Sequence, residues 1–427
     1  MAFVVCWPWF ALRMWKRGRF WPGFTERFAC YSREVRSALG LLQRPVWIHA
    51  VSVGEMMLAR VLVRELRRLR PEQDVVITCT TSTARVLGDR ELRDAHTVVL
   101  YSPSDLLPCV RAAFKVIRPC LILLMEQELW PNQLWEAERR GVPVWIVNAR
   151  LSDRSWKRFC QWRGALSSLL SRLSFVGLQS ERDRERFAQA GFPVHALFAM
   201  GSMKTDVADL AKADHGVAEG FRRDMGWKGD EEVLLAGSTH GGEEEILLRV
   251  YDRLRQTRPG LKLVLVPRHA ERAAEVLELA RKGQRSAVLR TKPELEAEIV
   301  VLNTTGELRS LYELATVVFM GKTLVSPKGK GGQNFLEAAR VGVPIVTGPR
   351  VENFRNLVED YLAAGALVRV ADEKALEKAL QELLASPEQQ RLLGQKAQER
   401  FQSELGVGAE MARRVAAFLG RSDLRGS

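Results

Sequence analysis

The sequence predicts an α/β protein built from two Rossmann-like domains, and three observations lead to this fold class. Short apolar runs alternate with helix-period segments along most of the chain, which is typical of parallel sheets flanked by helices. The chain has 427 residues, a length that favours two domains. The two halves of the chain also repeat the same local patterns in the same order.

The apolar runs form two series, which we interpret as the strands of two sheets. The first series comprises residues 46–51, 74–80, 97–101, 120–125, 142–149, 174–179 and 195–200. The second comprises residues 232–237, 261–267, 297–303, 316–321, 343–348 and 366–370. We place the domain boundary near residues 203–212. We therefore expect a basic N-terminal segment at 1–45, an N-terminal domain at 46–205 and a C-terminal domain at 206–404.

Two motifs occur in both halves. A strand leads into SVGE, from Ser52 to Glu55, in the first half and into STHGGE, from Ser238 to Glu243, in the second. A helix, a glycine stop and a β-rich run follow later in each half, as NQLWEAERRGVPV and NFLEAARVGVPI. Because doubly wound sheets bind ligands at the carboxyl ends of their strands, we expect both serine-to-glutamate loops to line a cleft that the two domains face.

Glu55 has two interpretations. Ser52-x-x-Glu55 spells a capping box, in which the two side chains bond main-chain N–H groups at a helix start. A carboxylate at a strand end can also take a proton from a bound hydroxyl group. The residues alone allow both roles.

The stretch SPKGKGGQNFLEAARVGVPIVTGP, residues 326–349, is the most informative candidate for a ligand site. Its glycines let the main chain approach a ligand, and the helix expected from Asn334 presents free N–H groups to an anion. We interpret it as a phosphate site in which the Glu337 carboxylate accepts hydrogen bonds from ribose hydroxyls. The alternative is a helix start capped by Asn334-x-x-Glu337, but a cap alone does not call for three glycines and two lysines.

The tripeptide Gly321-Lys322-Thr323 looks like the end of a Walker A motif. That motif needs another glycine five residues before Gly321, and Thr316 stands there. We therefore exclude a P-loop nucleotidase.

Charged side chains follow several other predicted strands. Arg268 and His269 follow the run at 261–267, and NTTGEL occupies residues 303–308; taken alone, both are typical of ordinary loops. Glu126 and Glu128 come directly after a buried strand, where acids are costly unless they are paired or functional.

The segment VNARLSDRSWKRFCQWR, residues 147–163, mixes cations with aromatic side chains. We assign its cations Arg150, Arg154, Lys157 and Arg158 to the acceptor or membrane side of the protein. Such a mixture suits a phosphorylated, lipid-bearing partner. The alternative is a solvated helix face.

The net charge is +13, and residues 1–45 carry eight Arg and Lys against two Glu. The tryptophans and arginines of MAFVVCWPWFALRMWKRGRFW suit an anionic membrane interface, although the apolar run is too short to span a bilayer. No RNA-binding or zinc-finger pattern supports nucleic acid as a partner. The six cysteines are widely spaced, which predicts neither a disulfide framework nor a zinc site.

Eight motifs occur in order from about residue 45 to about residue 370: VSVGE, ELWPN, VNARLSDRS, GSMKTD, STHGGE, PRH, TTGEL and GGQNFLEAA with the GVP that follows it. Together they resemble the 3-deoxy-D-manno-octulosonic acid (Kdo) transferases of Gram-negative lipopolysaccharide assembly. The resemblance implies a GT-B fold, in which two Rossmann-like domains face a central cleft. It also implies a C-terminal helix at 405–427 that packs back on the N-terminal domain.

An activity is implied by the same resemblance. Such enzymes are inverting, metal-independent glycosyltransferases that move Kdo from CMP-Kdo to a lipid A precursor, lipid IVA, at the cytoplasmic face of the inner membrane. The implied partners are therefore CMP-Kdo, the lipid A precursor and an anionic membrane surface, with no cofactor and no nucleic acid.

The matching motifs also imply roles for single residues. By likeness, Glu55 is the general base, and Glu126 and Lys204 stabilise the transition state, with Glu128 as the second choice for the acid. The implied CMP contacts are Arg268, His269, Gly306, Glu307, Leu308, Gly331, Gly332, Asn334, Phe335, Leu336 and Glu337.

Two positions depart from the family pattern. Gln333 stands where the family often has histidine in the glycine-rich loop, and Gln127 stands where threonine is usual between the two glutamates. Glutamine can donate a hydrogen bond but cannot carry a charge, so we expect the grip on the donor to differ at Gln333.

Two other functions fit part of the pattern. One is a GT-B transferase that uses a UDP-sugar with a lipid acceptor. Only the set of eight motifs listed above argues against this function. The other is a non-catalytic, basic, membrane-associated scaffold. The scaffold explains the charge, but it does not explain acids placed at strand ends beside a glycine- and lysine-bearing loop.

Overall fold

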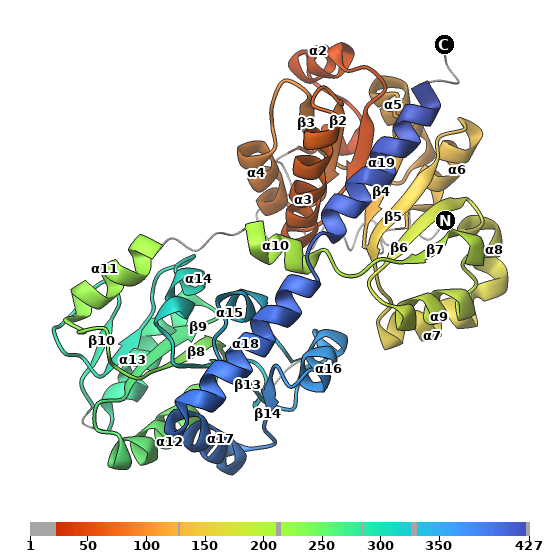
Figure 1. Cartoon of the computed structure of the whole chain (residues 1–427). Helices are drawn as coiled ribbons and strands as arrows, with labels where there is room; N and C mark the ends of the chain where they lie inside the picture. The colour runs from red at the N-terminus through yellow and green to blue at the C-terminus, as the bar shows by residue number, and fades with distance from the viewer. Residues whose placement is uncertain (1–22, 127–128, 211–214, 284, 326–330, 424–427) are drawn as a thin grey trace. The chain divides into compact units, whose positions relative to one another are not determined.

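The structure is a computed structural model that describes residues 23–126, 129–210, 215–283, 285–325 and 331–423. The chain forms two compact units, Met1–Val207 with Leu405–Ser427 and Ala208–Glu404 (Figure 1). The chain thus divides after Val207 and Glu404. The predicted division is after residues 205 and 404.

The first unit is built on a parallel sheet of seven strands in the order β3-β2-β1-β4-β5-β6-β7. The strands are β1 (Val46–His49), β2 (Val75–Cys79), β3 (Thr97–Tyr101), β4 (Leu121–Met125), β5 (Val144–Ala149), β6 (Leu173–Leu178) and β7 (Leu197–Ala199). Each overlaps one run of the first predicted series. The order reverses between β1 and β4, the position at which a doubly wound sheet leaves room for a ligand.

Helices cover both faces of this sheet (Figure 1). They are η1 (Glu26–Phe28), α2 (Arg33–Leu41), α3 (Val53–Leu69), α4 (Ser82–Glu91), α5 (Leu107–Ile117), α6 (Pro131–Arg139), α7 (Asp153–Gln161), α8 (Arg163–Leu170), α9 (Glu181–Gln189), η2 (Val194–Ala196) and α19 (Val407–Asp423). A serine or threonine N-cap accepts an N–H group at the start of α3, α4, α7 and α9. These caps fix where the chain turns from strand into helix.

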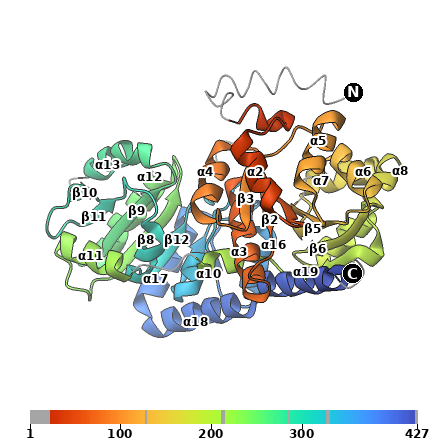
Figure 2. The same cartoon turned by 90° about the horizontal axis from the view of Figure 1, so that it is seen from above.

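The C-terminal helix α19 belongs to the first unit, where it packs along α3 in both views (Figures 1 and 2). Its start is held by the Asp206 carboxylate, which accepts the N–H groups of Gly406 and Gly408 at 2.7 and 2.8 Å. Asp206 lies in α10 (Lys204–Leu210), so this contact joins the end of the chain to the helix that carries Lys204.

The second unit has a parallel seven-stranded sheet in the order β10-β11-β9-β8-β12-β13-β14. The strands are β8 (Val233–Thr239), β9 (Lys262–Pro267), β10 (Ala287–Leu289), β11 (Ile299–Val301), β12 (Val317–Met320), β13 (Ile345–Thr347) and β14 (Val368–Arg369). Six of them overlap the second predicted series. The prediction missed β10, an edge strand whose apolar run is only three residues long in the sequence, between Ser286 and Arg290.

Around this sheet lie α11 (His215–Met225), α12 (Glu243–Thr257), η3 (Ala270–Arg272), α13 (Ala273–Arg281), α14 (Leu308–Leu311), η4 (Tyr312–Leu314), α15 (Leu336–Val341), α16 (Arg355–Ala363), α17 (Glu373–Ala385) and α18 (Pro387–Ser403). Helices α12, α13 and α17 cover the core that contains Leu234, Leu263 and Phe319. The prediction of two doubly wound α/β domains is confirmed.

His49 is a buried histidine at the end of β1 that bonds to the Thr78 hydroxyl group. The Trp47 indole N–H and the His49 Nδ1 atom both lie 2.9 Å from the Thr78 hydroxyl oxygen. An indole N–H can only donate, so the hydroxyl oxygen accepts from Trp47. Burial lowers the pKa of His49 to about 4.

We expect this histidine to make the first unit less stable in acid. Its pKa is about 4 in the folded chain and about 6.5 in an unfolded one, so the unfolded state binds the extra proton between these pH values. The stabilisation is complete above pH ~6.5 and falls by about 3 kcal/mol as the pH drops to ~4.

Urea unfolding of the wild type and of His49→Asn, followed by tryptophan fluorescence between pH 4 and 7, checks this expectation. Asparagine can accept the Thr78 hydroxyl but does not titrate, so the free energy of unfolding should change less with pH. His195→Asn, at an exposed position, is the control. The same pH dependence in all three proteins would contradict the assignment.

Candidate functional site

In the first unit, predicted site residues lie at the carboxyl ends of neighbouring strands. Glu55 is in the first turn of α3, which follows β1, while Glu126 follows β4 and Arg150 follows β5. These three strands are adjacent in the sheet, and adjacent strands lie about 4.8 Å apart. The turns are therefore neighbours along one edge of the sheet (Figure 1).

The Glu55 carboxylate is buried, with 8% of the residue exposed. Its Oε2 atom accepts the Val51 N–H at 2.7 Å, and its Oε1 atom accepts the Ser52 hydroxyl at 2.9 Å. The Ser52 hydroxyl oxygen accepts the Glu55 N–H at 3.3 Å. The capping arrangement is thus formed, with the glutamate reaching the N–H of residue 51. These bonds also orient the carboxylate at the strand end.

Glu126 and Lys204 form an ion pair at the end of β4. The Lys204 Nζ atom lies 4.0 Å from Glu126 Oε1, and both side chains are about three-tenths exposed. Burial lowers the pKa of the Lys204 ammonium and the neighbouring Arg150 guanidinium lowers it further, while Glu126 opposes both. The structure thus brings together an acid and two cations that the sequence places far apart.

Glu126 adopts a backbone conformation that is rare for its residue type. Its φ angle is 58°, in the left-handed region, and its N–H donates to the Val147 carbonyl of β5 at 2.9 Å. A non-glycine residue in this region costs of order 1 kcal/mol or more. The turn therefore directs this carboxylate at some cost in stability.

Asn148 is a site residue that the sequence did not single out, although it lies in the VNARLSDRS motif. It is buried, has a φ angle of 60°, and its Oδ1 atom accepts the Met203 N–H at 2.9 Å. Its Nδ2 atom has no hydrogen-bond partner among the described residues. The bond to Met203 fixes the chain just before Lys204, so Asn148 positions that lysine.

The four cations of residues 150–158 do not form one surface. Arg150 is half-buried beside Lys204, whereas Arg154, Lys157 and Arg158 are exposed on α7. None of the three exposed cations has an ion-pair partner in the described part of the chain. The helix therefore presents an open basic face, next to Trp162, which is 59% exposed.

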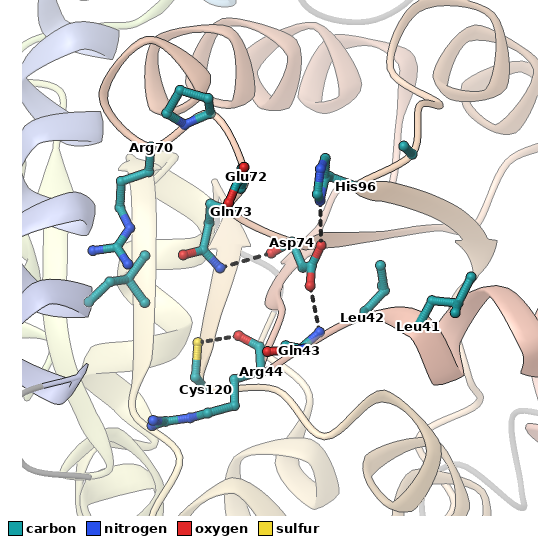
Figure 3. Close-up of a pocket in the computed structure, with 13 residues that line it drawn as sticks. Leu41, Leu42, Gln43, Arg44, Arg70, Glu72, Gln73, Asp74, His96 and Cys120 are labelled. Atoms are coloured by element: carbon teal, nitrogen blue, oxygen red, sulfur yellow. Dashed lines mark hydrogen bonds and ion pairs between the residues drawn. The ribbon is translucent and has the colours of Figure 1, made fainter. Parts of the chain in front are cut away.

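A cavity of about 940 Å³ lies at the opposite end of the first sheet (Figure 3). It is lined by Gln43 and Arg44 before β1, by Asp74 before β2, by Cys120 before β4 and by His96 before β3. These are the amino ends of the strands. The cavity contains none of the predicted site residues, so we do not identify it with the candidate site.

In the second unit, Arg268 and His269 are exposed directly after β9. The Arg268 N–H donates to the Thr239 carbonyl of β8 at 3.0 Å, which brings the two strand ends together. The His269 ring faces the ring of His240, with the two centroids 6.2 Å apart. Burial lowers the pKa of His240, and Lys322 and His269 act in the same direction. His240 thus joins the cluster, although only its STHGGE motif pointed to it.

Gly306, Glu307 and Leu308 form the turn into α14. Gly306 has a φ angle of 93° and open space around it. The Glu307 carboxylate accepts the Thr304 hydroxyl at 2.5 Å and lies 3.5 Å from the Arg290 guanidinium. The carboxylate is thus held by its own loop, while the glycine leaves the main chain accessible.

The described end of the glycine-rich loop bonds to other main-chain and side-chain groups of the second unit. The Gly331 N–H donates to Glu352 Oε2 at 2.7 Å, and the Gly332 N–H donates to the Lys322 carbonyl at 2.8 Å. These two N–H groups, which belong to the predicted phosphate-binding stretch, are therefore engaged within the protein. Residues 326–330, with the two lysines of the motif, lie outside the described residues.

The helix after this loop also starts later than predicted. Helix α15 begins at Leu336 and has six residues, and the Asn334 Oδ1 atom accepts the Leu336 N–H at 3.2 Å. Phe335 and Leu336 have buried side chains, so only their main chain can meet a ligand. Glu337 does not cap the helix. Burial raises the pKa of its carboxyl group, while the charges of Arg309 and Arg340 act to lower it.

Several predictions fall wholly or partly outside the described residues, namely Gln127, Glu128 and the first 22 residues of the basic N-terminal segment. Among the helices that the structure describes, none combines the length and apolarity needed to cross a membrane. The described residues contain no group of three or more His, Cys, Asp or Glu side chains placed to hold a metal ion.

Comparisons with known proteins match both units. Residues 22–207 match the family model described as 3-deoxy-D-manno-octulosonic-acid transferase, and residues 244–400 match glycosyl transferases group 1. The 3-deoxy-D-manno-octulosonic acid transferase of Haemophilus influenzae is 31% identical over 88% of this chain and 88% of its own. The Bordetella pertussis protein of the same name is 33% identical over 92% of this chain and 91% of its own.

Solved structures agree on the fold. UDP-GlcNAc 2-epimerase from Neisseria meningitidis covers 87% of this chain and 98% of its own with a TM-score of 0.59 at 12% identity. A putative UDP-N-acetylglucosamine 2-epimerase from Listeria monocytogenes covers 87% of this chain and 95% of its own with a TM-score of 0.55 at 16% identity. Together with the group 1 match, these likenesses confirm a GT-B type fold.

The strained turn at Glu126 leads to a prediction about stability. Glycine tolerates a positive φ angle and alanine does not, so Glu126→Gly should be more stable than Glu126→Ala by about 1 kcal/mol. Both variants lose the ion pair to Lys204, and the comparison therefore isolates the backbone effect. Urea unfolding of the two proteins measures the difference. Equal stability, or a more stable alanine variant, would show that the turn is not strained.

Proposed function

We propose a reaction for this chain from the premise that it belongs to the family of 3-deoxy-D-manno-octulosonic acid transferases and is a glycosyltransferase. We infer that it moves Kdo from CMP-Kdo to a lipid A precursor, lipid IVA, in lipopolysaccharide biosynthesis. The observation that carries this proposal is the match to two bacterial relatives of that name along nearly their whole length. The reaction inverts the anomeric centre and uses no metal.

Glu55 is the general base in this proposal. Its carboxylate takes the proton from the acceptor hydroxyl, the hydroxyl oxygen forms a bond to the anomeric carbon of Kdo, and the bond from that carbon to the phosphate oxygen of CMP breaks. CMP leaves with the electron pair. Support comes from the orientation of the carboxylate by Val51 and Ser52 at the strand end, where a base within reach of the hydroxyl speeds proton transfer.

Lys204 and Arg150 supply positive charge near the reacting groups. The donor has an anionic phosphate and an anionic sugar carboxylate, and charge builds on the phosphate as CMP departs. A cation held in place stabilises such charge without having to reorganise. Glu126 holds Lys204 by the ion pair at 4.0 Å, and Glu128 stays the second choice for this acid.

The second unit binds the donor. Arg268 and His269 follow β9 as exposed side chains and can contact the phosphate and the base. Gly306, Glu307 and Leu308 offer main-chain groups to the nucleotide. Since the Gly331 and Gly332 N–H groups are engaged, we assign the rest of the grip to the residues that follow. These are Gln333, Asn334, the main chain of Phe335 and Leu336, and the Glu337 carboxylate.

The acceptor is a phosphorylated lipid, and the open basic face of α7 suits it. Arg154, Lys157 and Arg158 are exposed there together with Trp162. Cations beside an aromatic ring attract anionic lipid headgroups. We therefore place the protein on the cytoplasmic face of the inner membrane, with an anionic membrane surface rather than nucleic acid as its partner.

We predict that Glu55→Gln abolishes transfer while the fold and CMP binding persist. Glutamine keeps the shape of the side chain but cannot take a proton, so the rate should fall by a factor of about 10²–10⁴. The assay is incubation with a CMP-Kdo-generating mixture and tetra-acylated lipid A precursor, with the product read by mass.

Ser52→Ala is the matched control, because it removes the capping partner and keeps the base. It should cost about 1 kcal/mol of stability and retain most of the activity, because the Val51 N–H still orients the Glu55 carboxylate. If Glu55 only caps α3, both variants will lose stability and both will stay active.

We also predict that CMP raises the melting temperature of the chain, whereas UMP and UDP do not. A ligand at a hundredfold excess over its Kd stabilises the folded state by about 2.7 kcal/mol, enough for a shift of several degrees. Thermal unfolding with each nucleotide measures the shift. A selective response to UDP would indicate a UDP-sugar enzyme, and no response to any nucleotide would favour a scaffold.

A further inference from the structure

Glu243 is a buried carboxylate with an unusual set of partners. It is the first residue of α12 and is 0% exposed. Its Oε1 atom accepts the N–H groups of Thr323 and Leu324 at 2.7 and 3.0 Å. Its Oε2 atom accepts those of Lys322 and His240 at 2.6 and 3.0 Å. A carboxylate has about four acceptor sites, so Glu243 is saturated by main chain.

The partners of Glu243 form a nest around it. Three successive N–H groups, those of residues 322–324, converge on one carboxylate, and Lys322 has a left-handed φ angle of 59°. Such nests bind anions in many proteins. Here the anion is a side chain of the protein itself. This occupancy leaves none of these three N–H groups for a nucleotide phosphate, in agreement with the missing glycine at position 316.

The turn that Glu243 holds is packed too tightly to move alone. A Cβ atom added to Gly321 would lie 2.5 Å from the Ser238 carbonyl oxygen, and one added to Gly348 would lie 2.4 Å from the Thr323 carbonyl. The Thr323 hydroxyl accepts the Gly348 N–H at 2.8 Å. The turn is therefore wedged between the ends of β8 and β13, with main chain on both sides.

This turn in turn supports the glycine-rich loop. The Lys322 carbonyl accepts the Gly332 N–H at 2.8 Å, and the Thr323 carbonyl accepts the Arg350 N–H at 3.0 Å. The Gly331 carbonyl accepts the Asn353 N–H at 3.0 Å. Hydrogen bonds thus connect Glu243 through residues 322–324 directly to Gly332, and to Gly331 by way of residues 350–353. Gly331 and Gly332 are the last residues before the proposed donor contacts.

We propose that Glu243 is a positioning residue for the donor site. It does not touch the sugar nucleotide; it holds the turn at 322–324, and that turn sets the place of Gly331, Gly332 and the residues that follow. The identity of the ligand rests on the proposed function, whereas the coupling between Glu243 and the loop does not.

The variant Glu243→Gln tests this role. Glutamine has one acceptor oxygen in place of two, and its amide N–H groups would face main-chain N–H groups, so at least two of the four bonds are lost. We expect the amides of residues 320–325 and 331–336 to exchange with deuterium about tenfold faster, or more, in the ligand-free protein. We expect CMP to bind about tenfold more weakly, with the KM for the donor raised more than kcat is lowered.

Glu388→Gln is the matched control, because Glu388 is also in the first turn of a helix of the second unit but is exposed on α18. It should leave both segments and CMP binding unchanged. Glu243→Asp keeps the negative charge but shortens the side chain, so it separates the effect of charge from that of reach. We expect the amides of the same two segments to exchange faster in this variant as well. Circular dichroism shows whether each variant folds. If Glu243→Gln does not fold, the exchange and CMP-binding measurements are made on Glu243→Asp.

Two results would overturn the inference. One is a folded variant whose segments 320–325 and 331–336 exchange as in the wild type. The other is faster exchange in these segments with CMP affinity unchanged, which would leave Glu243 a purely structural residue. A wild-type chain that does not bind CMP would instead overturn the proposed function, and the exchange comparison would still decide the coupling.

Discussion

Main-chain N–H groups at the ends of strands and the starts of helices need acceptors, and in both units carboxylates supply several of them. A buried N–H group without a partner costs free energy comparable to a lost hydrogen bond. Glu55 serves the turn after β1, Glu243 serves the turns after β8 and β12, and Asp206 serves the start of α19. Asp105 accepts the Asn132 and Gln133 N–H groups at the start of α6. The acids around the candidate site therefore also stabilise the fold, because they accept main-chain N–H groups.

The two echoed acids, Glu55 and Glu243, show how one local pattern leads to different roles. The bonds given for Glu55 come from its own turn, from residues 51 and 52. Those of Glu243 come mostly from a turn that lies 79 to 81 residues away in the chain. A carboxylate saturated by distant main chain cannot receive a substrate, but it can fix where a second loop lies. Glu55 is thus a candidate base, whereas Glu243 holds a distant turn in place.

The sequence predicts the frame well because the frame depends on local pattern. Apolar runs of five to eight residues are typical of strands buried on both faces, and all strands except the short β10 follow from them. The placement of Glu126, Arg150 and Arg268 at strand ends follows as well, because the carboxyl ends of parallel strands share one edge. The bonds of the Gly331 N–H and of Glu243 could not be predicted, since their partners lie 21 and about 80 residues away. The same limit hid Asn148, whose partner Met203 is 55 residues away.

Backbone strain is concentrated at these same turns. Of the eight described non-glycine residues with a positive φ angle, Glu126 and Asn148 lie at the ends of β4 and β5, and Ser238 and Lys322 lie at the ends of β8 and β12. Strained residues persist only where the surrounding bonds over-determine them. At Glu126 the restraint is the bond to Val147, and at Lys322 it is the bond to Glu243. At Lys322 the Glu243 carboxylate therefore does more than satisfy polar groups, because it also holds a strained turn. At Glu126 the neighbouring strand β5 has the same effect through a main-chain bond.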